Sequence, residues 1–276
     1  MRSIQFWLAS TALILGVHTA NAAESSASTE VIPSHPLLSD ELILTLGAFY
    51  PRSNTTAALG PSGGGSGVAI DFEDTLDLEK RTLTPTASVF WRASENWRVE
   101  FDYFEVSRDA TRTLATDIQW GDLTFTAGST VNSTFDFSDL RLSAVYSIFK
   151  RRDKELGAGL GVHVSGIKAS IASSGTGADS ADVTAPLPVV NIYGMFALTN
   201  KWAVDMRADW LSLTYGDYSG DVRNMAINLL YQPYRHVGFG VGMRNLVIDV
   251  DMDSPDWNGK ARLSFQGPAA FMTVSF

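Results

Sequence analysis

The 276-residue sequence contains no cysteine, so disulfide bonds cannot contribute to its stability. Without a cysteine after the apolar N-terminal run, a lipoprotein anchor is also excluded. Basic residues are outnumbered: 21 Lys and Arg stand against 30 Asp and Glu, which gives a formal net charge of −9. Because an acidic chain repels the phosphate backbone, we expect no nucleic-acid partner.

The N-terminus has the pattern of a secretory signal peptide. Arg2 supplies a positive charge, residues 4–17 form an uncharged apolar run, and residues 20–22 read Ala-Asn-Ala, a small-residue cleavage motif. The run is shorter than the roughly 20 residues of a membrane-spanning helix, which argues against a retained anchor. We expect residues 1–22 to be removed after export.

Long apolar runs are absent from the rest of the chain. No segment reaches the roughly 18 consecutive apolar residues of a transmembrane helix, so a helical membrane protein is excluded. Residues 23–40 lack periodicity and are predicted to be a flexible periplasmic leader. Over residues 41–276 the apolar residues recur with a period close to two, which indicates strands with one apolar face. Ten such segments are found, at residues 42–49, 83–92, 97–103, 139–148, 156–165, 190–198, 202–209, 224–232, 246–251 and 272–276.

Two kinds of connection alternate between these segments. The tight ones lie at residues 94–96, 151–154, 199–201 and 233–236. The long ones, rich in Gly, Ser and Asp, lie at residues 51–80, 110–132, 172–184, 216–221 and 252–259. Short turns on one rim and long loops on the other are typical of outer-membrane barrels, whose short turns are periplasmic. The sequence therefore predicts an all-β fold: a closed antiparallel up-and-down transmembrane β-barrel of ten strands, formed by residues 41–276.

The two faces of the predicted strands differ in chemistry. One is rich in Leu, Val, Trp and Tyr and almost without Lys, so we assign it to lipid. The other carries charges at consecutive positions, and these are predicted to lie in the lumen: Arg98, Glu100, Asp102, Asp139, Arg141, Asp205, Arg207 and Asp209. Aromatic residues near strand ends are predicted to form a membrane girdle: Trp91, Trp97, Tyr146, Trp202, Tyr231 and Phe276. The alternative is a soluble sandwich or periplasmic binding barrel, in which the apolar face would be the core.

Enclosed charges of both signs on neighbouring strands have two interpretations. They are predicted to pair with one another and fill a narrow lumen, because side chains fill small barrels. A narrow water-filled path with a local charge preference is the alternative. We therefore expect a structural or narrow-pore role.

The C-terminal segment carries a resemblance to a known family. Residues 269–276 alternate apolar side chains and end in Phe276, and a Gln-Gly pair precedes them at residues 266–267. This resembles the signal by which outer-membrane barrels are recognised for insertion, and the pattern of residues 41–276 is similar to small OmpA-like and OmpW-like barrels. Those families have eight strands, so eight is the alternative count. The resemblance implies contact with the barrel-assembly machinery through the strand ending in Phe276, and with outer-membrane lipids and lipopolysaccharide.

The sequence gives little support for catalysis. A hydrolase needs a histidine beside a nucleophile or water, with an orienting carboxylate or amide. After the signal peptide, His35 lies in the leader and His236 in a short turn, which leaves His163. His163 and Ser165 resemble the His-x-Ser motif of barrel lipid A deacylases, but Gly166 replaces the Asn of that family and no Glu follows. We expect a monomer that is not an enzyme and holds no cofactor or metal, with a lipid A-acting hydrolase as the alternative.

Overall fold

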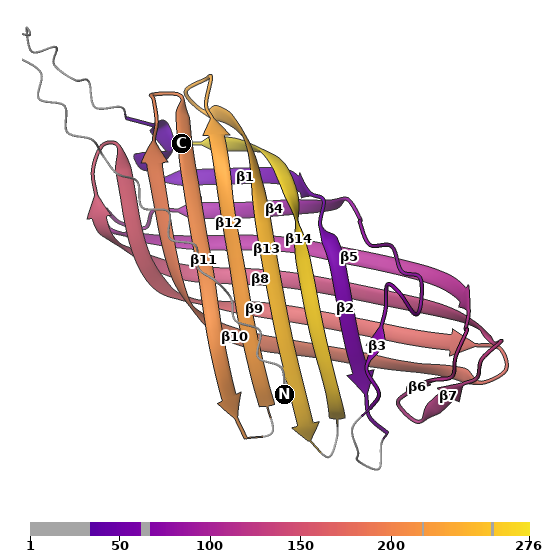
Figure 1. Cartoon of the computed structure of the whole chain (residues 1–276). Coiled ribbons are helices and arrows are strands. Elements are labelled where there is room, and N and C mark those ends of the chain that lie inside the picture. Colours follow the sequence, from indigo (N-terminus) through magenta and orange to yellow (C-terminus); the bar gives the residue numbers. More distant parts are fainter. Residues whose placement is uncertain (1–33, 62–66, 217, 255–256) are drawn as a thin grey trace, which may run out of the picture. The chain divides into compact units, whose positions relative to one another are not determined.

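The protein's computed structural model describes residues 34–61, 67–216, 218–254 and 257–276 (Figure 1). The predicted signal peptide at residues 1–22 and most of the predicted leader lie outside these ranges. Within them, no helix is long and apolar enough to cross a membrane. The elements are a short 3-10 helix, η1 (Pro36–Leu38), and the strands β1 (Leu42–Phe49), β2 (Arg52–Leu59), β3 (Ile70–Asp71), β4 (Thr84–Trp91), β5 (Trp97–Thr113), β6 (Ile118–Trp120), β7 (Leu123–Phe125), β8 (Thr130–Lys150), β9 (Lys154–Ser173), β10 (Gly177–Ala197), β11 (Trp202–Tyr215), β12 (Tyr218–Tyr231), β13 (Val237–Ser254) and β14 (Trp257–Ser275).

The described strands close into an antiparallel up-and-down barrel with ten wall strands. β1 and β2 form one of them, because both pair with β14, on either side of a break at Tyr50 and Pro51. A proline has no N–H for the ladder, which accounts for the break. The other nine are β4, β5 and β8 to β14, each paired with its neighbour, and β14 returns to β1. The prediction of ten strands rather than eight is confirmed.

Three of the five predicted long loops are wrong. The segment 172–184 belongs mostly to β9 and β10, which leave only residues 174–176 as a turn. The segment 216–221 belongs mostly to β12, and most of 252–259 belongs to β13 and β14. Within 110–132, β5 continues to Thr113 and β6 and β7 form a separate hairpin. These strands run far beyond the predicted apolar faces, as Figure 1 shows for β8, β9 and β10.

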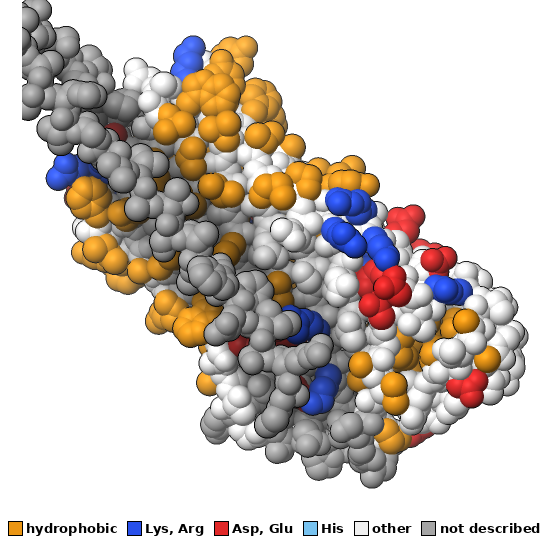
Figure 2. Space-filling view, in the orientation of Figure 1, with side chains coloured by type: hydrophobic (Ala, Val, Ile, Leu, Met, Phe, Trp, Pro, Cys, Tyr) orange, Lys and Arg blue, Asp and Glu red, His pale blue; other side chains and the backbone are white. Residues whose placement is uncertain are grey.

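The polarity of the inner and outer faces of the barrel wall changes from one end of the barrel to the other. The basal half consists of the wall residues nearest the four tight turns: 42–50, 84–92, 97–104, 139–150, 154–165, 189–198, 202–210, 224–231, 237–245 and 266–276. The distal half consists of the other wall residues together with β3, β6, β7 and the segment 67–83. In the basal half large apolar side chains face outward, and Ile148, Leu160 and Leu46 are 72%, 69% and 64% exposed. In the distal half the inward side chains are mostly apolar, and most of the outward ones are polar or charged. Figure 2 shows the result on one face, where hydrophobic side chains gather towards the basal end.

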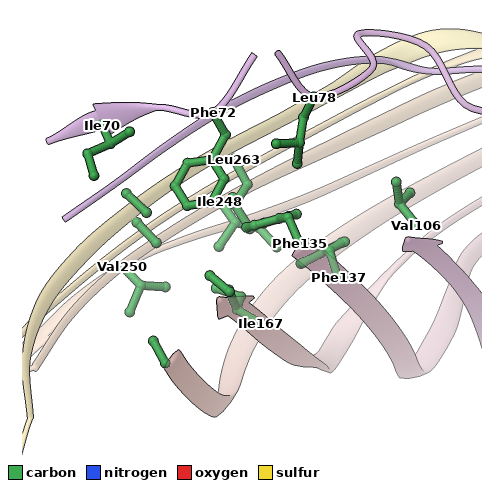
Figure 3. Packing of buried hydrophobic residues seen from close by; sticks show 14 of the residues in the cluster. Ile70, Phe72, Leu78, Val106, Phe135, Phe137, Ile167, Ile248, Val250 and Leu263 are labelled. Atoms are coloured by element: carbon green, nitrogen blue, oxygen red, sulfur yellow. The ribbon is translucent and has the colours of Figure 1, made fainter. Parts of the chain in front are cut away.

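The distal half therefore has the polarity of a soluble β-protein. Phe135, Phe137 and Phe265 are fully buried in its centre, and the rings of Phe137 and Phe265 are stacked with centroids 4.7 Å apart. Figure 3 shows Phe135 and Phe137 among the buried hydrophobic side chains. Its polar exterior, taken from the sequence alone, has the composition of loops. For this reason the predicted strands end too early in this half.

Residues 34–40 fold into the basal opening rather than forming part of a free leader. Leu37 and Leu38 are buried against Met195, Ala203 and Leu230. The prediction of a flexible leader is wrong for this stretch, because two adjacent leucines gain more from burial in the barrel mouth than from exposure to water.

Candidate functional site

All eight charged residues predicted for the lumen face inward in the basal half. Arg98 is 0% exposed, Arg141 and Asp209 are each 1% exposed, and Glu100 and Asp102 are each 6% exposed. They come from β5, β8 and β11, whose inward positions lie on every second residue. Burial of so many charges is tolerated only where they pair with one another.

Arg141 is the centre of this network. Its Nε and one Nη donate to the two oxygens of Asp209, both at 2.8 Å. The other Nη donates to Glu100 at 2.8 Å, and Glu100 also accepts from Arg98 at 2.5 Å. The Asn224 amide donates to Asp209 at 2.7 Å. One guanidinium thus links β5, β8 and β11 across the lumen.

His163 lies between two carboxylates. Its Nδ1 is 3.0 Å from Asp139, and its Nε2 is 3.4 Å from Asp209. The Ser165 hydroxyl donates to Asp139 at 2.9 Å. His163 and Ser165 therefore share Asp139 as a partner, and both are closed off, at 0% and 1% exposure.

A second group of charges lies beside the first. Arg207 makes two hydrogen bonds to Asp102, and Arg244 is 3.8 Å from Asp102 and 3.8 Å from Asp139. Asp205 accepts from the Asn228 amide at 3.3 Å. All four charged side chains point toward the same enclosed space.

Sequence reasoning missed three members of the network. Arg92 donates through both Nη atoms to Glu155, each at 2.9 Å, near the basal mouth. Arg244 belongs to the part of β13 that lies before the predicted segment 246–251. Arg92 already lies in the predicted segment 83–92, whereas Glu155 and Arg244 lie just outside the predicted segments and belong to the full lengths of β9 and β13.

A cavity of about 160 Å³ lies between the network and η1. Its walls include Glu100, Asp102, Asp205 and Arg207, and Leu37 lies at its basal end. Residues 34–40 are held there by Asp40, which pairs with Arg235 at 2.7 and 2.8 Å. The cavity has room for a few water molecules.

The distal end of the lumen is filled by apolar side chains rather than by paired charges. The segment 67–83 folds in between β2 and β5, so that Phe72, Leu76 and Leu78 are at most 2% exposed. Phe72 packs on Trp120 of β6 and on Phe135 of β8, with ring centroids 5.6 and 5.4 Å apart. Below this layer Glu73 pairs with Arg108 and accepts the Thr55 N–H at 2.7 Å. An apolar core thus separates the charged network from the distal surface.

The six predicted girdle residues lie on the outer face of the basal half near the tight turns. Trp97 contacts Tyr146 with ring centroids 5.2 Å apart, and Trp202 contacts Tyr231 at 4.5 Å. Trp91 and Phe276 are 47% and 58% exposed. This is where aromatic side chains would meet a membrane–water interface.

In the described ranges, no group of three or more histidine, aspartate or glutamate side chains is placed to hold a metal ion. Two acidic side chains on the outer distal face pair with bases: Asp251 with Lys260 at 2.7 Å and Asp249 with Arg262 at 3.6 Å.

Comparison with solved structures identifies the fold. The outer membrane protease OmpT of Escherichia coli superposes with a TM-score of 0.55 over 90% of this chain and 100% of its own, at 9% identity. The chain has the fold of a bacterial outer-membrane β-barrel. Lower similarities include Ail of Yersinia pestis, with a TM-score of 0.33, 10% identity and coverage of 84% and 98%, and Neisserial surface protein A, with a TM-score of 0.34, 11% identity and coverage of 85% and 97%. No family model and no curated protein sequence matches the chain.

Proposed function

We propose that this barrel has a structural role in the bacterial outer membrane, as a closed anchor. Its basal half would span the bilayer, and its distal half would stand outside as a rigid extension that presents the distal turns. The observation that carries the proposal is the filled lumen: paired charges and residues 34–40 in the basal half, and an apolar core in the distal half.

The change of polarity between the halves supports this placement. A bilayer requires an apolar outer band, and water requires a polar one. A soluble binding barrel would leave Ile148, Leu160 and Leu46 facing water over a large continuous surface, which monomeric soluble proteins avoid. The tight turns and Phe276 lie at the basal end, which the topology rule places in the periplasm.

The other roles considered from the sequence receive less support. A pore would have to pass both the Arg141 network and the core around Phe72. A lipid A hydrolase would need His163 and Ser165 to reach a substrate, yet both are enclosed and both bond to Asp139. We therefore propose no catalytic role for them.

Planar-bilayer conductance tests the closed state. The purified barrel should show no conductance steps under conditions in which a known porin gives them, while heat-modifiable gel migration reports that it is folded. A variant lacking residues 34–40 should also stay silent, because the distal core closes the barrel independently. Reproducible steps from the full chain would overturn the proposal.

A further inference from the structure

A pair of arginines marks the outer boundary of the apolar band. On the first wall strand the outward residues are Leu44, Leu46 and Ala48, and polarity changes at Arg52. An isolated antiparallel bridge places Arg81 directly opposite Arg52, with both side chains exposed on the outer face. Figure 2 shows basic side chains at an edge of the hydrophobic surface, with acidic side chains next to them.

Neither guanidinium forms a close ion pair with a described residue, although Asp74 lies near enough to Arg52 to attract it. Among the described residues neither guanidinium has a carboxylate within 4.0 Å, and the neighbouring Asp74 is taken by Lys80 at 2.6 Å. The Arg81 guanidinium lies instead over the Tyr50 ring, 5.6 Å from its centroid. Like charges placed directly opposite on paired strands repel each other. An anion bound between them would remove that repulsion.

Amide side chains continue the row around the barrel. Arg52 pairs across the sheet with Gln266, and Gln266 pairs with Asn245, both of which face outward. Neighbouring strands lie about 4.8 Å apart, so the row from Arg81 to Asn245 spans on the order of 14 Å. Amides donate to and accept from hydroxyl groups, which suits a sugar beside a phosphate.

Apolar surface lies on the basal side of the row. Leu83, two residues after Arg81, is 67% exposed, and Leu46 on β1 is 64% exposed. A ligand that fits the whole surface has an anionic phosphate, a sugar and acyl chains. We infer that Arg52 and Arg81 bind a phosphate of a phosphorylated glycolipid of the outer leaflet, of the lipid A type, with Gln266 and Asn245 against its sugar. This inference rests on the proposed outer-membrane location.

The test measures lipid bound to the full-length folded chain in detergent, by native mass spectrometry. The probes are bisphosphorylated lipid A, the same lipid without phosphates, and phosphatidylglycerol. The double variant Arg52→Gln/Arg81→Gln should bind bisphosphorylated lipid A about tenfold or more weakly, since two charge-assisted contacts are lost. The matched control, Arg151→Gln/Arg152→Gln, removes the same charge from a basal turn and should bind like the unaltered protein.

Two results would overturn the inference. One is undiminished lipid A binding by Arg52→Gln/Arg81→Gln, with heat-modifiable migration showing that the variant is folded. The other is equal affinity of the unaltered protein for phosphatidylglycerol, which would indicate a general anionic surface rather than a glycolipid site. Lipid binding is measured in detergent and does not depend on whether the barrel conducts ions. A conducting barrel would therefore refute the closed-anchor proposal and leave the glycolipid site untouched.

Discussion

Replacing Arg141 with methionine should be among the most destabilising single changes in the basal half. The Arg141 side chain is 1% exposed and donates three hydrogen bonds of 2.8 Å, two to Asp209 and one to Glu100. The substitution removes all three. Each bond to a charged group contributes about 1.5–3 kcal/mol. Glu100 still accepts a hydrogen bond from Arg98, and Asp209 still accepts one from Asn224. The loss of stability is therefore smaller than the sum of the three bonds. Breaking a buried pair from one side typically costs about 3–5 kcal/mol, and we expect a value in that range.

The assay is urea unfolding of the barrel in lipid vesicles, followed by tryptophan fluorescence. Arg262→Met is the matched control, because its side chain is 66% exposed and lies 3.6 Å from Asp249, so the free energy of unfolding should fall by at most about 1 kcal/mol. The double variant Arg141→Met/Asp209→Asn removes charge from both partners and should recover part of the loss, since the uncompensated carboxylate is gone. Equal effects of Arg141→Met and Arg262→Met would refute the view that the network holds the basal half together.

Three further predictions concern other parts of the barrel. Leu160→Lys, on the outer basal face, should lower the free energy of unfolding in vesicles by about 2–4 kcal/mol, whereas Thr134→Lys on the outer distal face should change it little; equal effects would contradict the membrane assignment. Phe72→Ala should cost about 3–5 kcal/mol in the same assay, because the ring is fully buried, and a loss below 1 kcal/mol would contradict the packed distal core. Burial lowers the pKa of His35, against opposing effects of the Lys201 carbonyl and Asp40, so protonation opposes docking and residues 34–40 should loosen as the pH falls below about 6.5. The protection factor of the Leu37 amide, which compares its exchange rate with the intrinsic rate at the same pH, should fall between pH 7.5 and 5.5. The amide nitrogen lies 3.4 Å from His35 Nδ1, and His35→Gln should abolish this fall.

The basal half could be predicted from the sequence because its outer and inner faces differ sharply. Leu, Val and Trp at every second position, with Arg98, Glu100 and Asp102 between them, indicated both the strand and its orientation. The same parity placed the six aromatic residues of the girdle. Nine of the ten predicted segments lie in the basal half and carry this signal. The remaining one, 246–251, lies in the distal half, where Leu246, Ile248 and Val250 face inward rather than outward.

The distal half could not be predicted in the same way. There the pattern is inverted, with residues such as Phe135 and Phe137 inside and Thr134 and Asp136 outside, so a polar composition is compatible with either a loop or a water-exposed strand. Arg92 and Glu155, from β4's end and β9's start, meet only through barrel closure, and no local spacing indicates their pairing. The docking of Leu37 depends likewise on a lumen that the sequence pattern does not display.

The absence of cysteine from the chain permits one direct measurement of the two-halves account. Single cysteines are placed along the outer face of β8, at Asn132, Thr134, Leu140, Leu142 and Ala144, and the barrel in vesicles is treated with a charged, membrane-impermeant maleimide. Labelling should be fast at Asn132 and Thr134 and should drop sharply from Leu140 onward, where lipid covers the strand. Uniform labelling along β8 would contradict the assignment of the basal half to the bilayer.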